Sequence, residues 1–556
     1  MKDTDLEFIS YAYGQNHFER DADLQAVLRH FWSDYADHVE ELRDFGAYAG
    51  CEVYESVYHI DHDAPPVLVA HDLDGNRVDR VRLSPSEQAV LQATTRAIRP
   101  PYEGGSWHHH YALLYLLADP GLGCVLTITG QTVYALHKYA APSGGPASLA
   151  NEEHAAMEPH FTEWQAQLLD GVAFGATWFT ESQGGSDLGA NETEAVQRDG
   201  VWLLTGEKYF ASGAGLADYA IVTARLDGAR SGPKGLSLFL LPRLNRAGAL
   251  NYHVRRLKDK SATRAVPSGE VELVDSEAYL IGKAEEGIYY TLENLNVSRL
   301  ANSVAAMATG KKAHLEVLGR VVHRHSFGKA LVEHPLIRRD LTDLAVRSAG
   351  GLALAFHAID KFDHAWSVRP PYTPAYHHAR FLTHLAKNRT ANHAAAMTAL
   401  GMELFGGLGF LEEYAVARWH REALITPIWE GPSNIQALDF LETLHKQRAH
   451  ESFLAEMVPL LESVGTAESA LALQVMEQTL THLVSLPSEQ AQWHAKFGLQ
   501  KVADAAQVAL LYDLAKDQGG RYEKLAQLYA RHFLGNEEYP DWALKDSAVW
   551  GDGGNA

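Results

Sequence analysis

The chain has 556 residues, of which 46% are hydrophobic, and its 70 acidic and 48 basic residues give a formal net charge of −22. This length is enough for three or four domains with packed cores, and the composition excludes a disordered or fibrous protein. The acidic balance argues against nucleic acid as the main partner, because basic side chains drive binding to phosphates.

The number of cysteines and the sequences of the two chain ends indicate the cellular compartment in which we expect the protein. Two cysteines, Cys51 and Cys124, are too few for a disulfide framework and are typical of a reducing environment. The polar residues 1–7 lack the apolar core of a signal peptide, residues 553–556 are not a peroxisomal address, and no apolar run is long enough to span a membrane. We therefore expect a soluble, cytoplasmic protein.

Helical spacing dominates residues 1–170, for example over 24–29 and 87–98, and loops rich in Gly and Pro interrupt it. Residues 171–285 change to short apolar or alternating runs separated by Asp-Gly turns, which predicts an antiparallel β-domain. The four clearest runs are residues 201–206, 220–224, 236–242 and 269–273.

Long helices return over residues 286–446. One of them covers residues 378–404 and is expected to end at the glycine pair Gly406-Gly407. Residues 447–556 predict a helical extension, since apolar residues recur there at spacings of three and four; they are Leu473, Met476, Leu480 and Leu483.

Two loop motifs in the β-domain suggest a cofactor. The run Thr180-Glu-Ser-Gln-Gly-Gly-Ser186-Asp offers hydroxyls and free N–H groups beside small residues, which suits a phosphate or a polar heterocycle. The run Gly-Glu-Lys-Tyr-Phe210-Ala-Ser212-Gly follows a predicted strand and places an aromatic ring near a hydroxyl. Taken singly, each run is also compatible with an ordinary turn or with core packing.

Two further motifs lie in the helical region. The run Arg324-His-Ser-Phe327-Gly-Lys places a guanidinium close to an aromatic ring, which suits a diphosphate and an adenine. Taken alone, the run is more simply interpreted as a basic helix end. Glu403-Leu-Phe-Gly-Gly407-Leu-Gly-Phe follows a long helix instead of a strand, so it is not a dinucleotide-binding βαβ fingerprint.

The segment Ile-Trp429-Glu430-Gly431-Pro-Ser-Asn434-Ile carries the candidate base. Glu430 stands among apolar neighbours before a Gly-Pro turn, and partial burial there would make it a usable base near neutral pH. A lone glutamate in a loop is usually only solvated, so this interpretation depends on the other motifs.

In this order, the motifs resemble the acyl-CoA dehydrogenase family over about residues 100–446. Within that family the chain is most similar to the AidB-like, alkylation-response subgroup. The features are Glu403 before the paired glycines, the run Arg-Leu-Lys-Asp-Lys at 256–260, the Trp-Glu-Gly run and a helical tail of about a hundred residues.

The resemblance implies an α+β fold: an N-terminal helical domain (1–170), a β-domain (171–285), a four-helix bundle (286–446) and a helical extension (447–556), assembled as a homotetramer. It also implies FAD lying between the β-domain and the bundle, completed by a neighbouring subunit. The implied cofactor-binding residues are Thr180, Ser186, Phe210, Ser212, Arg324, Phe327, Glu403, Gly407 and Asn434. Of these, Arg324 and Phe327 would reach the FAD of a partner subunit.

The same resemblance implies a reaction. Glu430 would remove the pro-R α-proton of an acyl-CoA thioester while the β-hydride moves to flavin N5. The thioester carbonyl would be polarised by a ribityl hydroxyl and by the N–H of Glu430. Arg299, Trp429 and Gly431 would contact the substrate, and an electron-transfer flavoprotein would take the electrons.

Some positions depart from the family pattern. Family members that carry the base on another helix place it just before an Arg, but here Ser298 precedes Arg299, which leaves Glu430 as the candidate. Relatives that oxidise nitroalkanes have Asp at this position, which argues against that activity. Glu403 replaces a common Gln, so its charge near a diphosphate needs a partner such as Arg324, and Pro432 removes a frequent hydroxyl.

Several alternatives stay open. The chain could be a DNA-associated protective flavoprotein, although residues 451–556 hold 7 basic and 15 acidic residues, and 7 minus 15 is −8. It could be an acyl-CoA oxidase, which the sequence does not distinguish from a dehydrogenase. The tail could serve oligomerisation or close the pocket.

The histidines at 108–110 and 323–325 raise the possibility of a metal site. No second set of ligands stands at a suitable spacing, so no metal is predicted.

Overall fold

The computed structural model describes residues 8–140 and 152–551, so residues 1–7 and 553–556 considered above lie outside the described residues. The chain forms two compact units. We call residues 1–55, 99–120 and 299–556 the helical unit and residues 56–98 and 121–298 the barrel unit. No helix among the described residues has the length and apolar character needed to cross a membrane.

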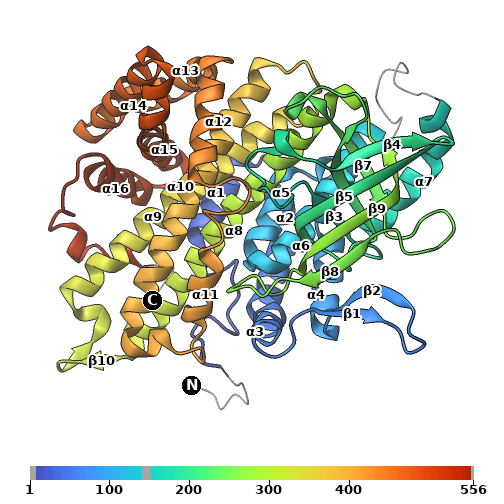
Figure 1. The fold of residues 1–556 in the computed structure, drawn as a ribbon. Coiled ribbons are helices and arrows are strands. Elements are labelled where there is room, and N and C mark those ends of the chain that lie inside the picture. Colours follow the sequence, from blue (N-terminus) through green and yellow to red (C-terminus); the bar gives the residue numbers. More distant parts are fainter. Residues whose placement is uncertain (1–7, 141–151, 552–556) are drawn as a thin grey trace. The chain divides into compact units, whose positions relative to one another are not determined.

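The barrel unit is built around one sheet (Figure 1). Its strands are β3 (Gly175–Trp178), β4 (Glu194–Arg198), β5 (Val201–Ser212), β6 (Tyr219–Leu226), β7 (Leu236–Pro242), β8 (His253–Leu257) and β9 (Ser268–Leu280). The pairings run β6-β4-β5-β9-β7 and return from β7 to β6, so five strands close a barrel, with β3 and β8 at its sides. The four predicted strand runs fall within β5, β6, β7 and β9.

Most of these pairings are antiparallel, but β3 and β4 each run parallel to β6. The prediction of an antiparallel domain therefore needs this correction; the crossovers that parallel pairs require leave little trace in a pattern of short runs. The predicted Asp-Gly turn between β4 and β5 has positive φ at both Asp199 and Gly200, as a type I′ hairpin requires. Trp178, Leu204, Phe239 and Val271 belong to the apolar cluster inside the sheet.

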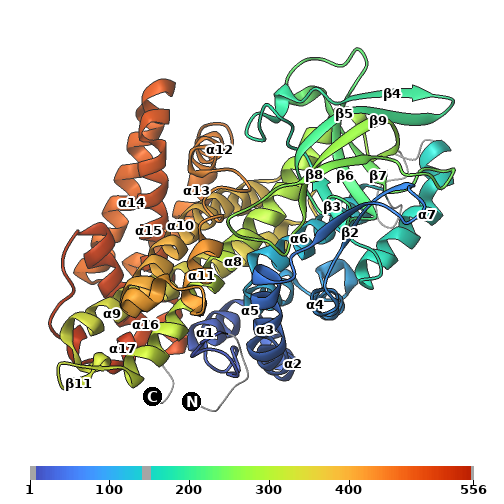
Figure 2. The same cartoon turned by 60° about the horizontal axis from the view of Figure 1, so that its bottom comes forward.

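Other elements of the barrel unit lie beside this sheet (Figure 2). They are the hairpin β1 (Val67–His71) and β2 (Arg77–Arg82), with α3 (Tyr54–His62, which begins in the helical unit), α4 (Pro85–Ala97), α6 (Pro120–Ala135), α7 (Glu152–Leu169) and the first third of α8 (Gly287–His323). The hairpin β1–β2 was not predicted, because four of the six residues of β2 are charged and β1 is only five residues long.

The helical unit contains the bundle and the tail. Its helices are α1 (Ala22–Phe31), α2 (Tyr35–Tyr48), α5 (Trp107–Leu117), the rest of α8, α9 (Pro335–Ala365), α10 (Pro374–Phe405), α11 (Ala415–Ala423), α12 (Ser433–His445), α13 (Ala449–Glu462), α14 (Ala467–Ser485), α15 (Ser488–Gln518), α16 (Gly520–Tyr529) and α17 (Ser547–Trp550). Two short strands, β10 (His325–Ser326) and β11 (Lys329–Ala330), form a hairpin after α8. As predicted, α10 ends at Gly406, which has a φ of +64°.

Glycines let the long bundle helices approach closely. A Cβ added to Gly351 on α9 would lie 2.5 Å from Sδ of Met307 on α8, and one added to Gly310 on α8 would lie 3.0 Å from Sδ of Met397 on α10. Both contacts are with the ends of methionine side chains, so the absence of a Cβ at these glycines leaves room that the two methionines fill between the helices. Side chains of α8 and α10 donate hydrogen bonds to the turn that carries Glu430.

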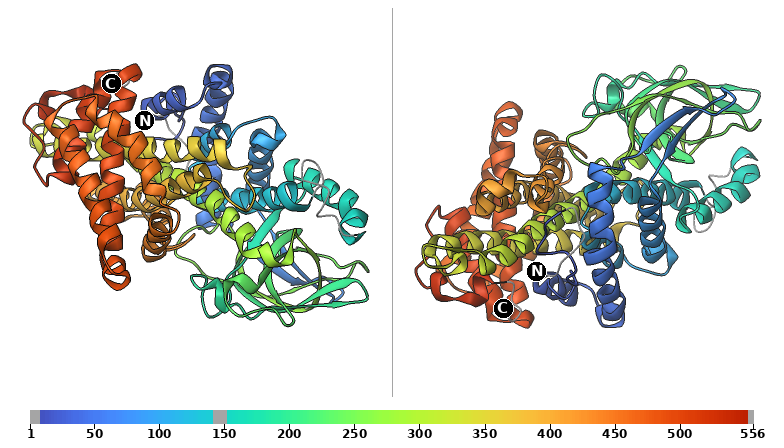
Figure 3. Two further views of the ribbon diagram at one scale, coloured as in Figure 1. Left: turned by 90° about the horizontal axis from the view of Figure 1, so that it is seen from above. Right: turned by 90° about the horizontal axis from the view of Figure 1, so that it is seen from below.

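The tail packs on the bundle within the helical unit. Helices α14 and α15 form an antiparallel helical hairpin (Figure 3), and α15 also contacts α1, α9, α10 and α12. Three of the four residues of the predicted apolar face are buried, since Met476, Leu480 and Leu483 are at most 1% exposed, whereas Leu473 is half-buried.

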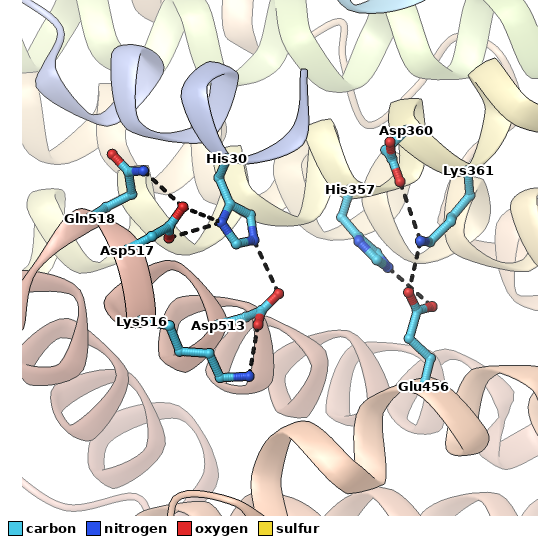
Figure 4. A network of polar contacts seen from close by, with 9 residues as sticks. All are labelled: His30, His357, Asp360, Lys361, Glu456, Asp513, Lys516, Asp517 and Gln518. Atoms are coloured by element: carbon cyan, nitrogen blue, oxygen red, sulfur yellow. Dashed lines mark hydrogen bonds and ion pairs between the residues drawn. The ribbon is translucent and has the colours of Figure 1, made fainter. Parts of the chain in front are cut away.

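Polar contacts add to this packing (Figure 4). His30 on α1 lies 3.1 Å from Asp513 and 3.0 Å from Asp517, both on α15. Glu456 on α13 lies 3.4 Å from His357 and 2.9 Å from Lys361, both on α9. The tail is therefore an integral layer of the helical unit.

Candidate functional site

Glu430 occupies a backbone conformation that L-residues rarely adopt. Its φ is +57° and that of Gly431 is +93°, in the turn that leads from α11 into α12. The left-handed region costs a residue with a Cβ about 1–2 kcal/mol, so the surrounding structure must hold this turn in place.

Three buried side chains donate hydrogen bonds to the two carbonyl oxygens of this turn. Nε of Arg299 lies 3.1 Å from the Glu430 oxygen, and Nε2 of Gln436 lies 2.9 Å from the same atom and 3.1 Å from the Gly431 oxygen. Nζ of Lys387 lies 2.7 Å from the Gly431 oxygen. Because the donors come from α8, α10 and α12, three helices jointly fix the backbone of this turn.

A second layer supports these donors. Arg299 forms an ion pair of 2.8 Å with Asp439 on α12, and Nδ1 of His384 on α10 lies 2.9 Å from Oε1 of Gln436. Burial, and then the nearby Arg299, lowers the pKa of His384 to about 3, so this imidazole is neutral. Arg299 also lowers the pKa of Asp439 although burial opposes it. The layer is therefore charged at Arg299 and Asp439 but neutral at His384.

Lys387 is the participant that the sequence analysis missed. It is 1% exposed, and burial followed by repulsion from Arg299 lowers the pKa of its ammonium to about 7. The signal that could have found it is the spacing of Arg380, His384 and Lys387, which puts three basic residues on one face of a helix otherwise rich in Ala and Leu.

Three further residues from the sequence analysis are Trp429 and Asn434 in the helical unit and Ser298 in the barrel unit. Trp429 donates its indole N–H to Oδ1 of the buried Asn302. Ser298 is 3% exposed and its hydroxyl lies 3.1 Å from the Leu295 carbonyl of its own helix, so it takes part in helix hydrogen bonding. Asn434 is exposed in the first turn of α12.

In the barrel unit, most of the predicted loop after β3 is exposed. Thr180 is half-buried, and Ser182, Gln183, Gly185 and Ser186 are exposed. A Cβ on Gly185 would lie 2.4 Å from Oγ1 of Thr180, so only glycine lets the loop fold back on this hydroxyl. The exposed hydroxyls and backbone of this loop can form hydrogen bonds with a polar ligand.

A buried ion pair anchors this loop to the neighbouring strand. Nζ of Lys208 lies 2.7 Å from Glu181, and both residues are at most 2% exposed. Glu181 also accepts hydrogen bonds from Oγ1 of Thr193 at 2.6 Å and from N–H of Glu192 at 2.6 Å. Burial opposes the charge, but Lys208 lowers the pKa of Glu181. The Thr-Glu and Gly-x-Lys motifs are therefore two halves of one anchor.

Phe210 and Ser212 lie on β5. Phe210 is 57% exposed, which is unusual for a ring in a barrel and leaves an aromatic face open to a ligand. Nζ of Lys258 lies 3.3 Å from the ring centre of Tyr209 and 4.8 Å from that of Phe210. Ser212 is half-buried, and its carbonyl accepts the indole N–H of Trp178 at 2.9 Å.

The remaining predicted residues lie on the surface of the helical unit. Arg324 is exposed at the end of α8, and Phe327 is 94% exposed at the tip of the hairpin β10–β11, with a φ of +48°. Glu403 and Gly407 are exposed at the end of α10. The suggested pairing of Glu403 with Arg324 is not formed: neither residue has an ion pair within 4.0 Å among the residues that the structure describes.

Of the histidines singled out in the sequence, His109 belongs to a compact group of possible ligands. His38 and Glu41 on α2 and His109 on α5 offer three ligand atoms within 4.8 Å of one another. Glu41 lies 3.2 Å from a ring nitrogen of each histidine, so its carboxylate already pairs with both rings. The prediction of no metal stays a prediction.

Comparisons with known proteins agree with this architecture. Models of the acyl-CoA dehydrogenase C-terminal and middle domains match residues 285–445 and 176–276, and a model of the N-terminal domain of the adaptive response protein AidB matches residues 10–152. AidB of Escherichia coli (strain K12) is 31% identical over 417 residues, which cover 70% of this chain and 71% of that protein. Acyl-CoA dehydrogenase family member 11 of Caenorhabditis elegans is 28% identical over 503 residues, covering 85% and 78%.

Solved structures show the same fold. Caenorhabditis elegans ACDH-11 in complex with C11-CoA superposes with a TM-score of 0.81 at 24% identity, covering 100% of this chain and 98% of that one. Bd2924 in its apo form gives a TM-score of 0.77 at 26% identity, covering 91% and 99%. The chain is thus an oxidoreductase of the acyl-CoA dehydrogenase family and carries an AidB-type N-terminal domain.

Proposed function

We propose that the protein catalyses the FAD-dependent α,β-dehydrogenation of an acyl-CoA thioester, with Glu430 as the base that removes the α-proton. The observation that carries this proposal is the fixed turn at Glu430, whose unfavourable φ is maintained by Arg299, Gln436 and Lys387. Strained backbone that is held by several partners is typical of functional sites.

FAD is the cofactor of this reaction, and the exposed groups of the barrel unit suit it. Thr180 and Ser186 would hold polar atoms of the nucleotide, and Phe210 and Ser212 would line the flavin ring. In the helical unit, Glu403, Gly407 and Asn434 would contact the rest of FAD. When bound, FAD supplies the acceptor for the hydride that leaves the β-carbon.

Transfer of the substrate's α-proton is then the task of residues of this chain. Glu430 takes the α-proton, while Arg299, Trp429 and Gly431 shape the pocket beside it. A thioester substrate agrees with the family and with C11-CoA in the complex of ACDH-11, a protein of the same fold. Because a misplaced base loses much of its rate, the support of the turn is part of this chemistry.

A homotetramer accounts for the exposed end of α8. Phe327 is 94% exposed, and an exposed aromatic ring near Arg324 suits a contact with a second copy of the chain. In that contact, both residues would reach the cofactor of the partner subunit.

Electrons would pass to an electron-transfer flavoprotein. DNA remains a poor partner, because the tail from 451 to 556 carries a net charge of −8.

Anaerobic titration of the purified yellow protein with a panel of acyl-CoAs tests the proposal. At least one thioester should bleach the flavin, and Glu430→Gln should keep FAD but lower the rate of bleaching by about 10³-fold. The exposed Glu413→Gln serves as the matched control and should bleach normally. If no thioester bleaches the wild-type flavin, or if Glu430→Gln bleaches at the normal rate, the proposal fails; release of peroxide in air would identify an oxidase instead.

A further inference from the structure

The three consecutive histidines on α5 point in different directions, because successive residues of a helix are about 100° apart. Nε2 of His108 lies 3.5 Å from Asp360 on α9, and His110 packs against aromatic rings of its own helix. His109 faces α2 instead, where a carboxylate oxygen of Glu41 lies 3.2 Å from its Nε2. His109 is therefore the histidine of this run that can act together with side chains of α2.

His109 is buried, and its ring nitrogens lack hydrogen bonds. The residue is 1% exposed, and neither Nδ1 nor Nε2 has a hydrogen-bond partner within the described part of the chain. The contact between Nε2 and Glu41 is short enough but is not aligned as a hydrogen bond. Because a buried polar atom without a partner costs free energy, a metal ion bound to Nε2 would supply an interaction that the ring lacks.

The candidate ligand atoms already have nearly the spacing of a tetrahedral metal site. Nδ1 of His38 and Nε2 of His109 each lie 3.2 Å from the same oxygen of Glu41, Oε2. Two atoms bound to one Zn²⁺ at tetrahedral angles, with bonds of about 2.0–2.1 Å, are about 3.3–3.4 Å apart. Two edges of the tetrahedron are therefore formed, and the ligand atoms of the two rings, at most 4.8 Å apart, need only approach further.

Neighbouring side chains hold these ligands in place. His38 and Glu41 are three residues apart on α2, so they lie on one face of that helix. The ring of His38 stacks on Trp32 with centroids 4.6 Å apart, and the same indole lies 5.9 Å from the ring of His109. Buried Trp32 thus forms an apolar wall beside both rings. Since the side chains of His38 and Glu41 are 33% and 44% exposed, an ion can enter from solvent.

We propose that His38, Glu41 and His109 bind a divalent transition metal ion of the Zn²⁺ type, which holds α2 against α5. Two imidazoles and one carboxylate suit Zn²⁺, whereas Mg²⁺ and Ca²⁺ prefer oxygen ligands, and water would take the fourth position on the exposed side. Helix α2 would gain from this link, because it buries only four of its 14 residues.

This inference departs from the sequence-based prediction of no metal. That prediction considered ligand spacing along the chain, whereas two of these ligands lie on α2, far in sequence from the histidine run on α5. The site contains none of the residues assigned to the proposed reaction. Its test therefore needs no acyl-CoA, and the outcome is independent of the proposed function.

Metal binding to the purified full-length protein tests the site. Isothermal titration with ZnCl₂ should show a tight site, and Co²⁺ in its place should give the intense visible absorption of a four-coordinate ion. His38→Phe keeps a ring to stack on Trp32 but removes the ligand nitrogen, and Glu41→Gln keeps the size but removes the charge. Each should weaken Zn²⁺ binding by about 100-fold or more, since loss of an outer-shell partner alone typically costs 10–100-fold.

His59→Phe provides the matched control. The half-exposed His59 also lies close to a carboxylate, 3.5 Å from Asp63, but it belongs to no group of three possible ligands among the described residues. This variant should bind Zn²⁺ as wild type does. Wild-type affinity in His38→Phe overturns the site, and so does an equal loss in His59→Phe, which would mean that scattered surface histidines bind the ion.

Hydrogen exchange tests the link between the two helices. Zn²⁺ should slow exchange of the α2 amides in wild type but not in His38→Phe, because an ion that binds the folded helices opposes their local opening. The amides of α14, in the same unit but without these ligands, should change little. Unchanged exchange in α2 with Zn²⁺ bound overturns the proposal that the ion holds α2 against α5.

Discussion

The Glu181–Lys208 anchor of the barrel unit and the Glu430 turn of the helical unit both bury charge, but they balance it in different ways. Glu181 and Lys208 compensate each other directly at 2.7 Å, and hydrogen bonds satisfy the remaining oxygens. Lys387 donates to the Gly431 carbonyl instead, and burial and Arg299 lower its pKa to about 7. The first arrangement holds a loop through an ion pair, and the second holds a turn through hydrogen bonds to main-chain oxygens.

The largest expected effect comes from breaking the fixed pair. Lys208→Met leaves the Glu181 carboxylate buried without its cation, so the free energy of unfolding should fall by about 3–5 kcal/mol. Urea unfolding measures this loss, and flavin content should fall with it because the loop after β3 loses its anchor. Glu181→Gln combined with Lys208→Met should recover part of the stability. The exposed pair Arg198 and Asp275 supplies the control, since Arg198→Ala should change stability by about 0.5 kcal/mol or less.

A smaller effect on stability but a clear one on turnover is expected from Gly431→Ala. A Cβ there would lie 2.8 Å from Nε2 of Gln436, at a backbone φ of +93°. We expect a loss of about 1–3 kcal/mol in unfolding free energy and on the order of 10²-fold in flavin reduction, because the turn must move away from its donors. Gly520→Ala, where no heavy atom lies within 4 Å, should leave both quantities unchanged. Normal turnover in Gly431→Ala would show that the exact turn geometry is dispensable.

The smallest effect is expected where the tail meets α1. Burial opposes the charged ring of His30, but hydrogen bonds to Asp513 and Asp517 raise its pKa. A raised pKa gives stability that is present below the unfolded value of about 6.5 and is lost as pH rises through the folded value. His30→Gln should therefore lower the unfolding free energy by about 1 kcal/mol at pH 6 and by little at pH 8.5. An equal loss at both pH values would point to packing in place of charge.

The sequence predicted much of the fold because its signals are local. Apolar periodicity and the glycine stop located α10, and short apolar runs located β5, β6, β7 and β9. The parallel course of β3 and β4 beside β6 could not be predicted, since it depends on pairing between distant segments. Likewise, the run containing Glu181 and the run containing Lys208 were noticed separately, and only the folded chain joins them.

The support of Glu430 was the hardest part to predict. Lys387 and Gln436 belong to no recognised motif and act on main-chain atoms that every residue possesses. Nothing in the order of residues shows that a glutamate has a positive φ. The suggested ion pair of Glu403 with Arg324 failed for a related reason, because chemical complementarity does not indicate where two side chains lie.

The left-handed backbone at residue 430 also has an evolutionary consequence. Glycine accepts this conformation freely and asparagine tolerates it, so either would relieve roughly 1 kcal/mol of backbone cost that glutamate bears. Under the proposed function, a duplicated gene released from the reaction would gain robustness by losing the carboxylate. Gly or Asn at this position is then the expected mark of descendants that have abandoned the chemistry.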